Sequence, residues 1–311
     1  MQASTIARTT SPVDMRVVVA PVSFGLGDLV VSLPAIQALV ARARQGDEVW
    51  LLARAPSQAG LAERVEGLGG VVHEHDHTPD PGQRLVDLRD HPLQRDHWWG
   101  SPEFAAAFGH LGINDILERI CADFSIDADF SQPRPLASRH RPGLERTVLL
   151  VHETDGPEKR WPVERWRLVA ASLRAAGYDV AQVVREEPTD DALGLPACVA
   201  PTPGDAVDVL TACRGVIGVD TGLTHIAVQQ GRPTVVICRR SSVYVRPWAH
   251  CRALRGDHCT DECVAAEAAY AYNDRVSLRS FAPPPRRCPS DAMCLAGTAP
   301  SDAVGLLMEV L

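Results

Sequence analysis

The sequence predicts an α/β fold made of two doubly wound parallel sheets. Short apolar, β-branched runs alternate with stretches whose apolar residues recur at helical spacing, which is the pattern of βαβ units. This alternation stops in a proline-containing stretch at 131–146 and then starts again, so the 311 residues divide into two halves. We expect domains at 15–140 and 141–311 that face each other across a cleft at the carboxyl ends of their strands, with residues 1–14 as a disordered tail.

The first half begins with "MRVVVAPV" at 15–22, which has the composition of a buried parallel strand. In chain order, the next expected elements are a helix at 29–44, a strand at 48–54, a helix at 56–68 and strands at 70–75 and 84–89. Residues 91–130 are expected to be mainly helical. Within them, the aromatic stretch "HWWG" at 97–100 either packs in the core or offers a stacking surface to an acceptor ring.

The second half repeats the pattern from residue 147 onward. Here, too, the apolar runs are bounded by turn residues, and amphipathic stretches lie between them. We expect strands at 147–153, 178–184, 215–220 and 233–238, and helices at 162–177, 205–213 and 222–231.

Charge and hydropathy exclude several classes of partner. The net charge is −8, the pI is near 5.8, and the arginines are scattered among acidic residues. Neither nucleic acid nor an anionic lipid surface is therefore an expected partner. No apolar run approaches the length of about 18 residues that a membrane span needs. Because the start of the chain also lacks the apolar stretch of a signal peptide, we expect a cytoplasmic protein.

Nine cysteines in a chain without a secretory signal are expected to be reduced. Five of them follow residue 250, namely Cys251, Cys259, Cys263, Cys288 and Cys294. Their spacing is looser than the Cys pairs of structural zinc sites. Free thiols are therefore favoured, and a zinc site and a disulfide stay open as alternatives.

The first candidate motif is "GLGD", between the first strand and the first helix. Gly25 and Gly27 suggest a dinucleotide-binding turn, but the third glycine position is Val30, and the second strand ends in Arg54 rather than in an acid for a ribose. Asp28 would also repel a phosphate at the helix start. Asp28 is therefore interpreted either as a helix cap or as a general base that faces the cleft.

The second candidate is Lys159, in "HETDGPEKRWP" after the strand at 147–153. It is the only lysine among 31 basic residues. A flexible ammonium on a loop before a helix is a point charge suited to a phosphate, and Thr154 lies on the same loop. The alternative is a solvated lysine without a ligand.

The third candidate motif is "GVDTGLTH", where a buried strand ends at Asp220 and a helix follows. The free amides of a helix start can bind an anion. This start consists of Thr221, Gly222, Leu223 and Thr224. The alternatives are that Asp220 is only a helix cap and that His225 is only a hydrogen-bonded helix histidine.

Together "GLGD…LPAIQAL", "KRWPVERW" and "GVDTGLTHIA", in this order and at these distances, resemble glycosyltransferase family nine, the ADP-heptose:lipopolysaccharide heptosyltransferases. The resemblance covers about residues 15–240, weakens through 80–145 and returns faintly in "CLAGTAPSDAV". It implies a GT-B fold of two Rossmann-like domains, with the acceptor on the first and the nucleotide sugar on the second.

The resemblance also implies a role for each matched residue. Asp28 matches the general base that takes the proton of the acceptor hydroxyl as its oxygen attacks the anomeric carbon with inversion. Lys159 and Thr154 match ligands of the donor diphosphate, and Asp220 matches the sugar-binding aspartate. The remaining assignments are Thr221, Gly222, Leu223 and Thr224 at the diphosphate, His225 at the sugar, Glu186 or Glu187 at the ribose, and Gly25 and Gly27 in the acceptor-side turn.

No DxD-type cluster or His/carboxylate ligand set lies in the right place, so a metal-independent reaction is expected, with the ADP-sugar as co-substrate and no cofactor. The acceptor stays open between a soluble natural-product intermediate and a lipopolysaccharide core. In "CRRSSVYVRPW", Arg239, Arg240 and Tyr244 either line the sugar site or lie on the surface. The alternatives are a Rossmann-type oxidoreductase and a non-catalytic nucleotide-sugar-binding protein. The sequence does not predict the oligomeric state.

Overall fold

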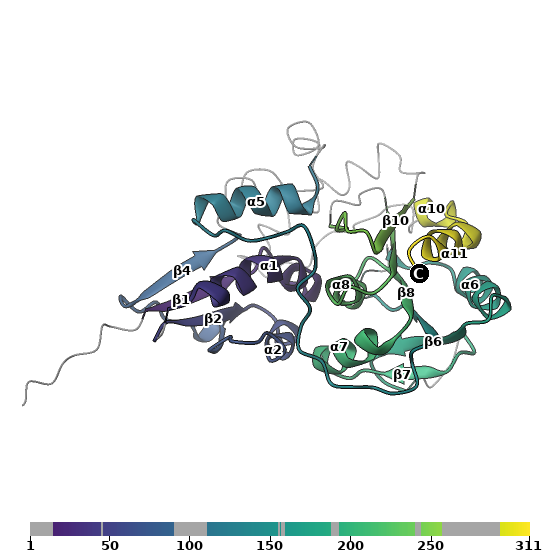
Figure 1. Cartoon of the computed structure of the whole chain (residues 1–311), viewed down its shortest axis with the longest axis horizontal. Coiled ribbons are helices and arrows are strands. Elements are labelled where there is room, and N and C mark those ends of the chain that lie inside the picture. The colour runs from purple at the N-terminus through teal and green to yellow at the C-terminus, as the bar shows by residue number, and fades with distance from the viewer. Residues whose placement is uncertain are drawn as a thin grey trace, which may run out of the picture.

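The computed structural model describes residues 15–44, 46–89, 111–154, 156, 159–187, 193–239, 244–256 and 293–311. Within these ranges the chain forms two parallel sheets, one in each half, and helices from both halves fill the space between the sheets (Figure 1). The segment that joins the halves runs from α5 along their junction to β5 (Figure 1).

The first sheet has the strand order β3-β2-β1-β4, and all its pairs are parallel. Its strands are β1 (Arg16–Ala20), β2 (Glu48–Ala53), β3 (Gly70–His73) and β4 (Gln83–Asp87). The helices of this half are α1 (Leu26–Arg42), α2 (Pro56–Ala62), the 3-10 turn η1 (Glu74–Asp76) and α5 (Ile113–Asp123). The winding reverses between β1 and β4, so the loop after β1 leaves the sheet at its switch point, where open α/β sheets bind ligands.

The second sheet has the strand order β10-β9-β8-β5-β6-β7, again all parallel. Its strands are β5 (Thr147–Val151), β6 (Asp179–Val184), β7 (Ala197–Val199), β8 (Gly215–Val219), β9 (Thr234–Cys238) and β10 (Cys251–Arg255). The helices are α6 (Val163–Ala175), α7 (Pro203–Ala212), α8 (Gly222–Gln229), α10 (Met293–Ala296) and α11 (Pro300–Met308). This is the 3-2-1-4-5-6 order of the Rossmann fold, with its switch point between β5 and β8.

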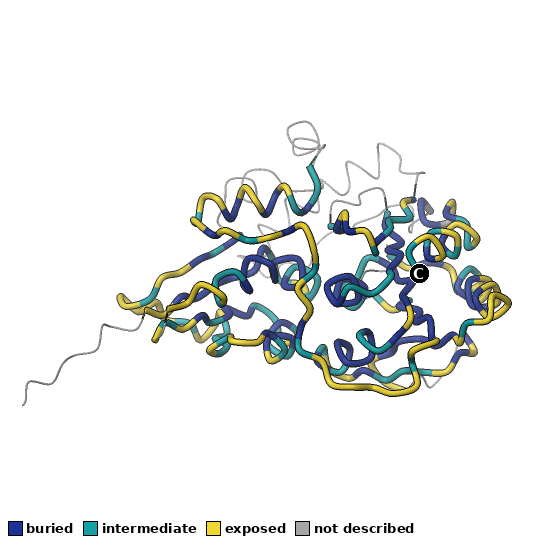
Figure 2. Tube along the Cα trace, viewed as in Figure 1, coloured by how far each residue is buried: buried dark blue, intermediate teal, exposed yellow. Residues whose placement is uncertain are grey.

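One hydrophobic cluster runs through both halves. It extends from Val17 and Val19 in β1, through α1, α7 and α8, to Leu149 and Val151 in β5. α1 packs against α8, and α2 packs against α7. A second cluster covers the outer face of the second sheet with α6 and α11. Figure 2 shows the buried residues gathered in the strands and in the helices at the junction, so the two halves are held together by a shared core.

The two parallel-sheet halves confirm the predicted fold class. Two strands were not predicted: β7 has only three residues, and β10 is an edge strand whose polar residues hide the apolar pattern. The helix expected at 56–68 ends at Ala62, since the chain turns before Gly67, whose φ is +79°. Of the residues 91–130, which were expected to be mainly helical, 113–123 form α5, whereas 124–130 form neither helix nor strand. Residues 91–110, which include the aromatic stretch at 97–100, lie outside the described residues. No helix among the described residues is long and apolar enough to cross a membrane.

Candidate active site

The loop after β1 leads into α1, and two buried polar side chains fix its backbone. Ser32 Oγ donates to the carbonyl of Asp28 at 2.7 Å. From α2, Gln58 Nε2 donates to the carbonyls of Ser23 and Gly25, both at 3.0 Å. Both side chains are fully buried. The first turn of α1, which carries Asp28, is therefore held from both sides.

Asp28 uses one carboxylate oxygen as a cap and leaves the other available. Its Oδ2 accepts the N–H of Gly25 at 2.8 Å, while Oδ1 accepts no hydrogen bond from the described residues. Burial raises the pKa of Asp28 to about 6, against the lowering effects of the Gly25 N–H, Lys159 and His225. The cap interpretation is therefore right for one oxygen, and the other oxygen is free to take a proton.

Lys159, Asp220 and His225 form a hydrogen-bonded group opposite Asp28. Lys159 Nζ donates to Asp220 Oδ2 at 2.9 Å and to the Asp220 carbonyl at 3.0 Å. His225 Nε2 lies 2.8 Å from Asp220 Oδ1, and because an ionised carboxylate only accepts, this nitrogen carries the proton. Burial acts to raise the pKa of Asp220, but Lys159 and His225 outweigh it and hold that pKa well below its usual range.

The local geometry explains why a lysine suits position 159. Its two acceptors are a carbonyl and a carboxylate oxygen of the same residue, Asp220, and a compact ammonium can contact both and keep a third N–H for a ligand. A guanidinium presents a planar fork on a longer side chain instead. The loop is anchored by Trp161, whose ring is buried and donates to the carbonyl of Leu295 at 3.0 Å.

The starts of α1 and α8 touch each other at this site. A Cβ on Gly27 would lie 3.7 Å from Cα of Gly222 and 3.3 Å from Cδ2 of His225, and a Cβ on Gly222 would lie 2.8 Å from Cβ of Leu26. Glycine therefore permits this close approach. Each helix start presents unpaired N–H groups and the positive end of its dipole. Together with Lys159, they make a positive focus between the two carboxylates of Asp28 and Asp220.

The other residues predicted to bind the donor diphosphate differ in the contacts of their side chains. Thr154 Oγ1 accepts the N–H of Gly156 at 3.2 Å, in the same loop as Lys159. Thr224 is fully buried and its hydroxyl donates to the carbonyl of Val219 at 2.7 Å, so its side chain serves the helix–strand packing. The other helix-start residues, Thr221, Gly222 and Leu223, are partly exposed.

Among the described residues, the predicted ribose ligands are not brought into this cluster. Glu186 and Glu187 are exposed after β6, and no hydrogen bond or ion pair joins them to the cluster among the described residues. Tyr244 packs against the shared core, and Arg239 directly follows β9. Arg240 lies outside the described residues, as do Cys259, Cys263 and Cys288, while Cys251 and Cys294 are buried.

Sequence reasoning missed a charged cluster at the carboxyl edge of the first sheet. Arg54 has a fully buried side chain, and its Nη2 donates to both carboxylate oxygens of Asp87 at 3.1 Å. The guanidiniums of Arg54 and Arg89 lie 5.5 and 5.2 Å from the ring centre of Phe24, and both contact Glu74 at 3.3 Å. The available signal was the position of Arg54 and Asp87, each at the carboxyl end of a predicted strand.

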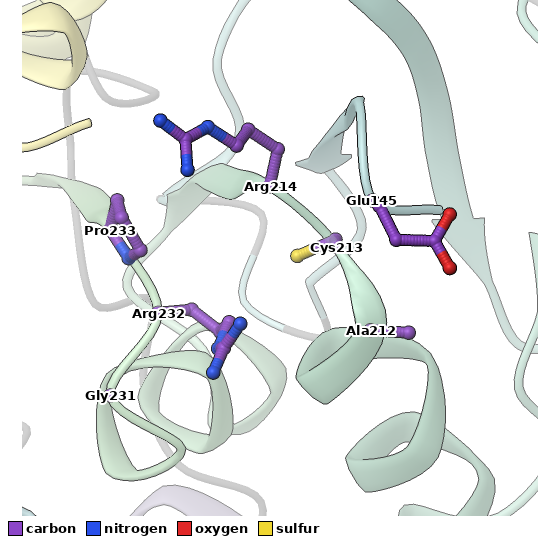
Figure 3. Close-up of a pocket in the computed structure, with 7 residues that line it drawn as sticks. All are labelled: Glu145, Ala212, Cys213, Arg214, Gly231, Arg232 and Pro233. Atoms are coloured by element: carbon purple, nitrogen blue, oxygen red, sulfur yellow. The ribbon is translucent and has the colours of Figure 1, made fainter. Parts of the chain in front are cut away.

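A cavity of about 270 Å³ lies elsewhere in the second half. Figure 3 shows its lining residues, which are Glu145, Ala212, Cys213, Arg214, Gly231, Arg232 and Pro233. Arg214 and Pro233 directly precede β8 and β9, so this cavity is at the amino ends of the strands, whereas Asp220 follows the carboxyl end of β8. No group of three or more His, Cys, Asp or Glu suited to a metal ion occurs in the described part of the chain.

Sequence comparison identifies relatives of part of the chain. The sequence model of glycosyltransferase family 9 (heptosyltransferase) matches residues 199–264, which include Asp220 and α8. Lipooligosaccharide heptosyltransferase 2 of Haemophilus influenzae is 31% identical over an alignment of 105 residues that covers 30% of this chain and 30% of that protein. The chain thus matches less than a third of the length of this curated relative. These matches confirm the family resemblance that the three motifs indicate.

Solved structures share the fold over most of the chain. The glycosyl transferase family 9 protein of Veillonella parvula has a TM-score of 0.63 at 14% identity, over 96% of this chain and 98% of that one. E. coli heptosyltransferase WaaC with ADP-2-deoxy-2-fluoro heptose has a TM-score of 0.56 at 14% identity, over 86% and 100%. The iron-containing dodecameric glycosyltransferase TibC of enterotoxigenic E. coli has a TM-score of 0.59 at 15% identity, over 95% of this chain and 75% of that one. The chain therefore shares its two-domain α/β fold with these glycosyltransferases.

Proposed function

We propose that this chain is an inverting glycosyltransferase that moves a heptose or similar sugar from an ADP-sugar to an acceptor hydroxyl or amine without a metal ion. The acceptor is a soluble natural-product intermediate or a lipopolysaccharide core. One observation carries the proposal. The starts of α1 and α8 meet beside Lys159, and Asp28 has an available carboxylate oxygen at the same point.

In this mechanism the positive focus receives the donor diphosphate. Breaking the bond between the anomeric carbon and the phosphate oxygen leaves negative charge on ADP. The N–H groups of Gly222 and Leu223 at the start of α8, and the third N–H of Lys159, stabilise this charge. Asp220 keeps the ammonium in place, and because each carboxylate oxygen has a second lone pair, it can also accept a sugar hydroxyl.

Asp28 acts as the general base on the acceptor side. Its Oδ1 takes the proton of the acceptor hydroxyl while that oxygen attacks the anomeric carbon from the face opposite the diphosphate, which inverts the configuration. A pKa of about 6 keeps the carboxylate ionised at neutral pH and makes it a stronger base than an exposed aspartate. Turnover is therefore expected to fall as the pH drops below about 6, because the base becomes protonated.

The test combines ligand binding with turnover. ADP, UDP and GDP are titrated against the protein by calorimetry and thermal shift, and ADP at 100 times its Kd should stabilise by about 2.7 kcal/mol. ADP-heptose is then offered with candidate acceptors, and NMR reports the anomeric configuration of the product. Asp28→Asn should retain ADP binding and lose turnover. A preference for UDP or GDP, or full activity of Asp28→Asn, would contradict the proposal.

A further inference from the structure

Arg246 is a buried arginine with no acidic partner among the residues that the structure describes. It lies between β9 and β10 in the second half and is 3% exposed. Its Nη1 donates to Asn114 Oδ1 in α5, and its Nη2 donates to the carbonyl of Val31 in α1. The guanidinium lies 5.5 Å from the ring centre of Phe130 and 5.2 Å from that of Trp248.

A cation in these surroundings is costly for the fold. Burial lowers the pKa of Arg246 to about 9, and the thiol of Cys121 in α5 opposes this only in part. Even buried ion pairs can often be replaced by apolar side chains of similar volume without loss of stability. The guanidinium therefore supplies something that hydrophobic packing would not.

The contacts of Arg246 cross the junction between the halves. Both of its hydrogen-bond acceptors belong to the first half, and Val31 lies within one turn of Asp28 in α1. The helix contains Pro34, which has no N–H and so leaves the carbonyl of Val30, next to Val31, without its helical donor. Arg246 also lines a narrow gap between α1 and α8, together with His225.

We propose that Arg246 is a positioning residue that holds α1 against the second half and thereby keeps Asp28 aligned with Lys159 and Asp220. The inference rests on the proposed function in that it takes Asp28 as the base. The position of the Asp28 carboxyl can nevertheless be tested without assuming that Asp28 is the base, because the proposal says which residue fixes that position. If the contact is lost, α1 separates from α8 and water reaches that carboxyl.

A matched pair of substitutions tests the proposal. Arg64 also crosses the junction, and its Nη2 donates to Asp208 Oδ2 at 2.8 Å and to the carbonyl of Gly204 at 3.1 Å. It joins the turn after α2 to α7, and none of its hydrogen bonds to the described residues reaches α1. Arg246→Lys and Arg64→Lys remove the same planar fork from two places. Arg246→Met, which also removes the charge, is compared with both.

The first readout is the titration of Asp28 in protein labelled with ¹³C at aspartate carboxyls, with Asp28→Asn for assignment. The charges that face this carboxyl, those of Lys159, His225 and Asp220, are the same in all variants. In Arg246→Lys and Arg246→Met the pKa of Asp28 should fall from about 6 toward its ordinary value of 3.8, because the carboxyl gains water. Arg64→Lys should leave it in place.

The second readout is kinetic. Both Arg246 variants should lose kcat by up to about a hundredfold, the effect of misplacing a catalytic group by roughly 1 Å, with ADP affinity unchanged. An unchanged Asp28 titration in folded Arg246→Lys would overturn the proposal, and so would an equal shift in Arg64→Lys. If the wild type neither binds ADP nor turns over an ADP-sugar, the proposed function fails, yet the titration still decides whether Arg246 positions Asp28.

Discussion

Replacing Asp28 by asparagine should make the protein more stable at neutral pH while it removes the proposed base. Asparagine keeps a side-chain oxygen that can accept the N–H of Gly25, as Asp28 Oδ2 does at 2.8 Å. The substitution removes only the negative charge of the carboxylate, which is partly buried and desolvated. Because the desolvation of the carboxylate outweighs its attraction to Lys159 and His225, the negative charge destabilises the folded state.

The size of the effect follows from the shift in pKa. Asp28 has a folded-state pKa of about 6 against an ordinary value of 3.8, and one pKa unit corresponds to about 1.36 kcal/mol. Between these two values the folded state holds a proton that the unfolded state has released. The free energy of unfolding therefore falls as the pH rises through this window, by about 3 kcal/mol, and this deficit persists at neutral pH. The Asp28→Asn variant would carry no such deficit, because its amide does not titrate in this range.

The assay is urea denaturation of the wild type and Asp28→Asn at pH 7.5 and at pH 4. The variant should be more stable by up to about 3 kcal/mol at the higher pH, and the difference should nearly vanish at the lower pH. Asp115→Asn is the matched control, because Asp115 Oδ2 caps the N–H of Gly112 at 2.9 Å in the same way but lies exposed on α5. The reasoning is refuted if Asp28→Asn is the less stable protein at pH 7.5, or if its advantage is equally large at pH 4.

Three further substitutions probe the same site. Lys159→Arg should weaken ADP binding by about 1–3 kcal/mol in calorimetry although it conserves charge, and Arg160→Lys at the next position should not weaken it. If Lys159→Arg binds ADP as tightly as the wild type, the argument for a compact ammonium fails. Gly222→Ala should separate the starts of α1 and α8 and lower kcat, because its Cβ would lie 2.8 Å from a neighbouring side chain. Gly305→Ala should leave kcat unchanged, because no atom lies within 4 Å of its Cβ position. Equal kcat values for the two variants would contradict this prediction. Gln58→Leu should lower kcat and leave ADP affinity intact, since Gln58 Nε2 holds the loop before Asp28 through the carbonyls of Ser23 and Gly25, and its Oε1 accepts only the N–H of Arg54 in the same half. A loss of ADP binding instead would place this residue on the donor side.

The sequence was sufficient for the fold because most strands are buried on both sides. Continuous apolar runs such as those of β5 and β8 are unambiguous when glycine or proline bounds them. The two strands that escaped prediction lie at the edges of the second sheet, where one side of each strand has no neighbour and the apolar signal is diluted. The segment after α5 was predicted to be helical because it contains apolar residues. These residues are buried although the backbone there forms neither helix nor strand, as for Phe130 and Leu136.

The sequence singled out Asp28, Lys159, Asp220 and His225, which the structure brings together, but it did not show how they are connected. Lys159 and Asp220 were found separately, as ligands of a phosphate and a sugar, and their ion pair across 61 positions has no local signature. Thr224 was assigned to the ligand because it opens a helix, yet its hydroxyl faces the preceding strand, and side-chain direction cannot be read from a motif. Gln58 acts from another helix, and only folding brings it to the loop.

The arrangement couples the strength of the proposed base to the junction of the two halves. The pKa of Asp28 is high because the carboxyl is buried where α1 meets α8, and that burial depends on residues of both halves, with Gly27 against Gly222 at the contact. If the halves separate, the carboxyl gains water and becomes a weaker base; if they close, it regains a pKa near the working pH, where a general base is most effective. An ionised diphosphate at Lys159 would raise this pKa further, because two negative groups would then face each other across the positive focus. The pH at which kcat falls on the acid side should therefore be higher than the pH at which kcat/KM for the donor falls. If the two pH profiles fall at the same pH, the charge of the bound donor does not affect the pKa of Asp28.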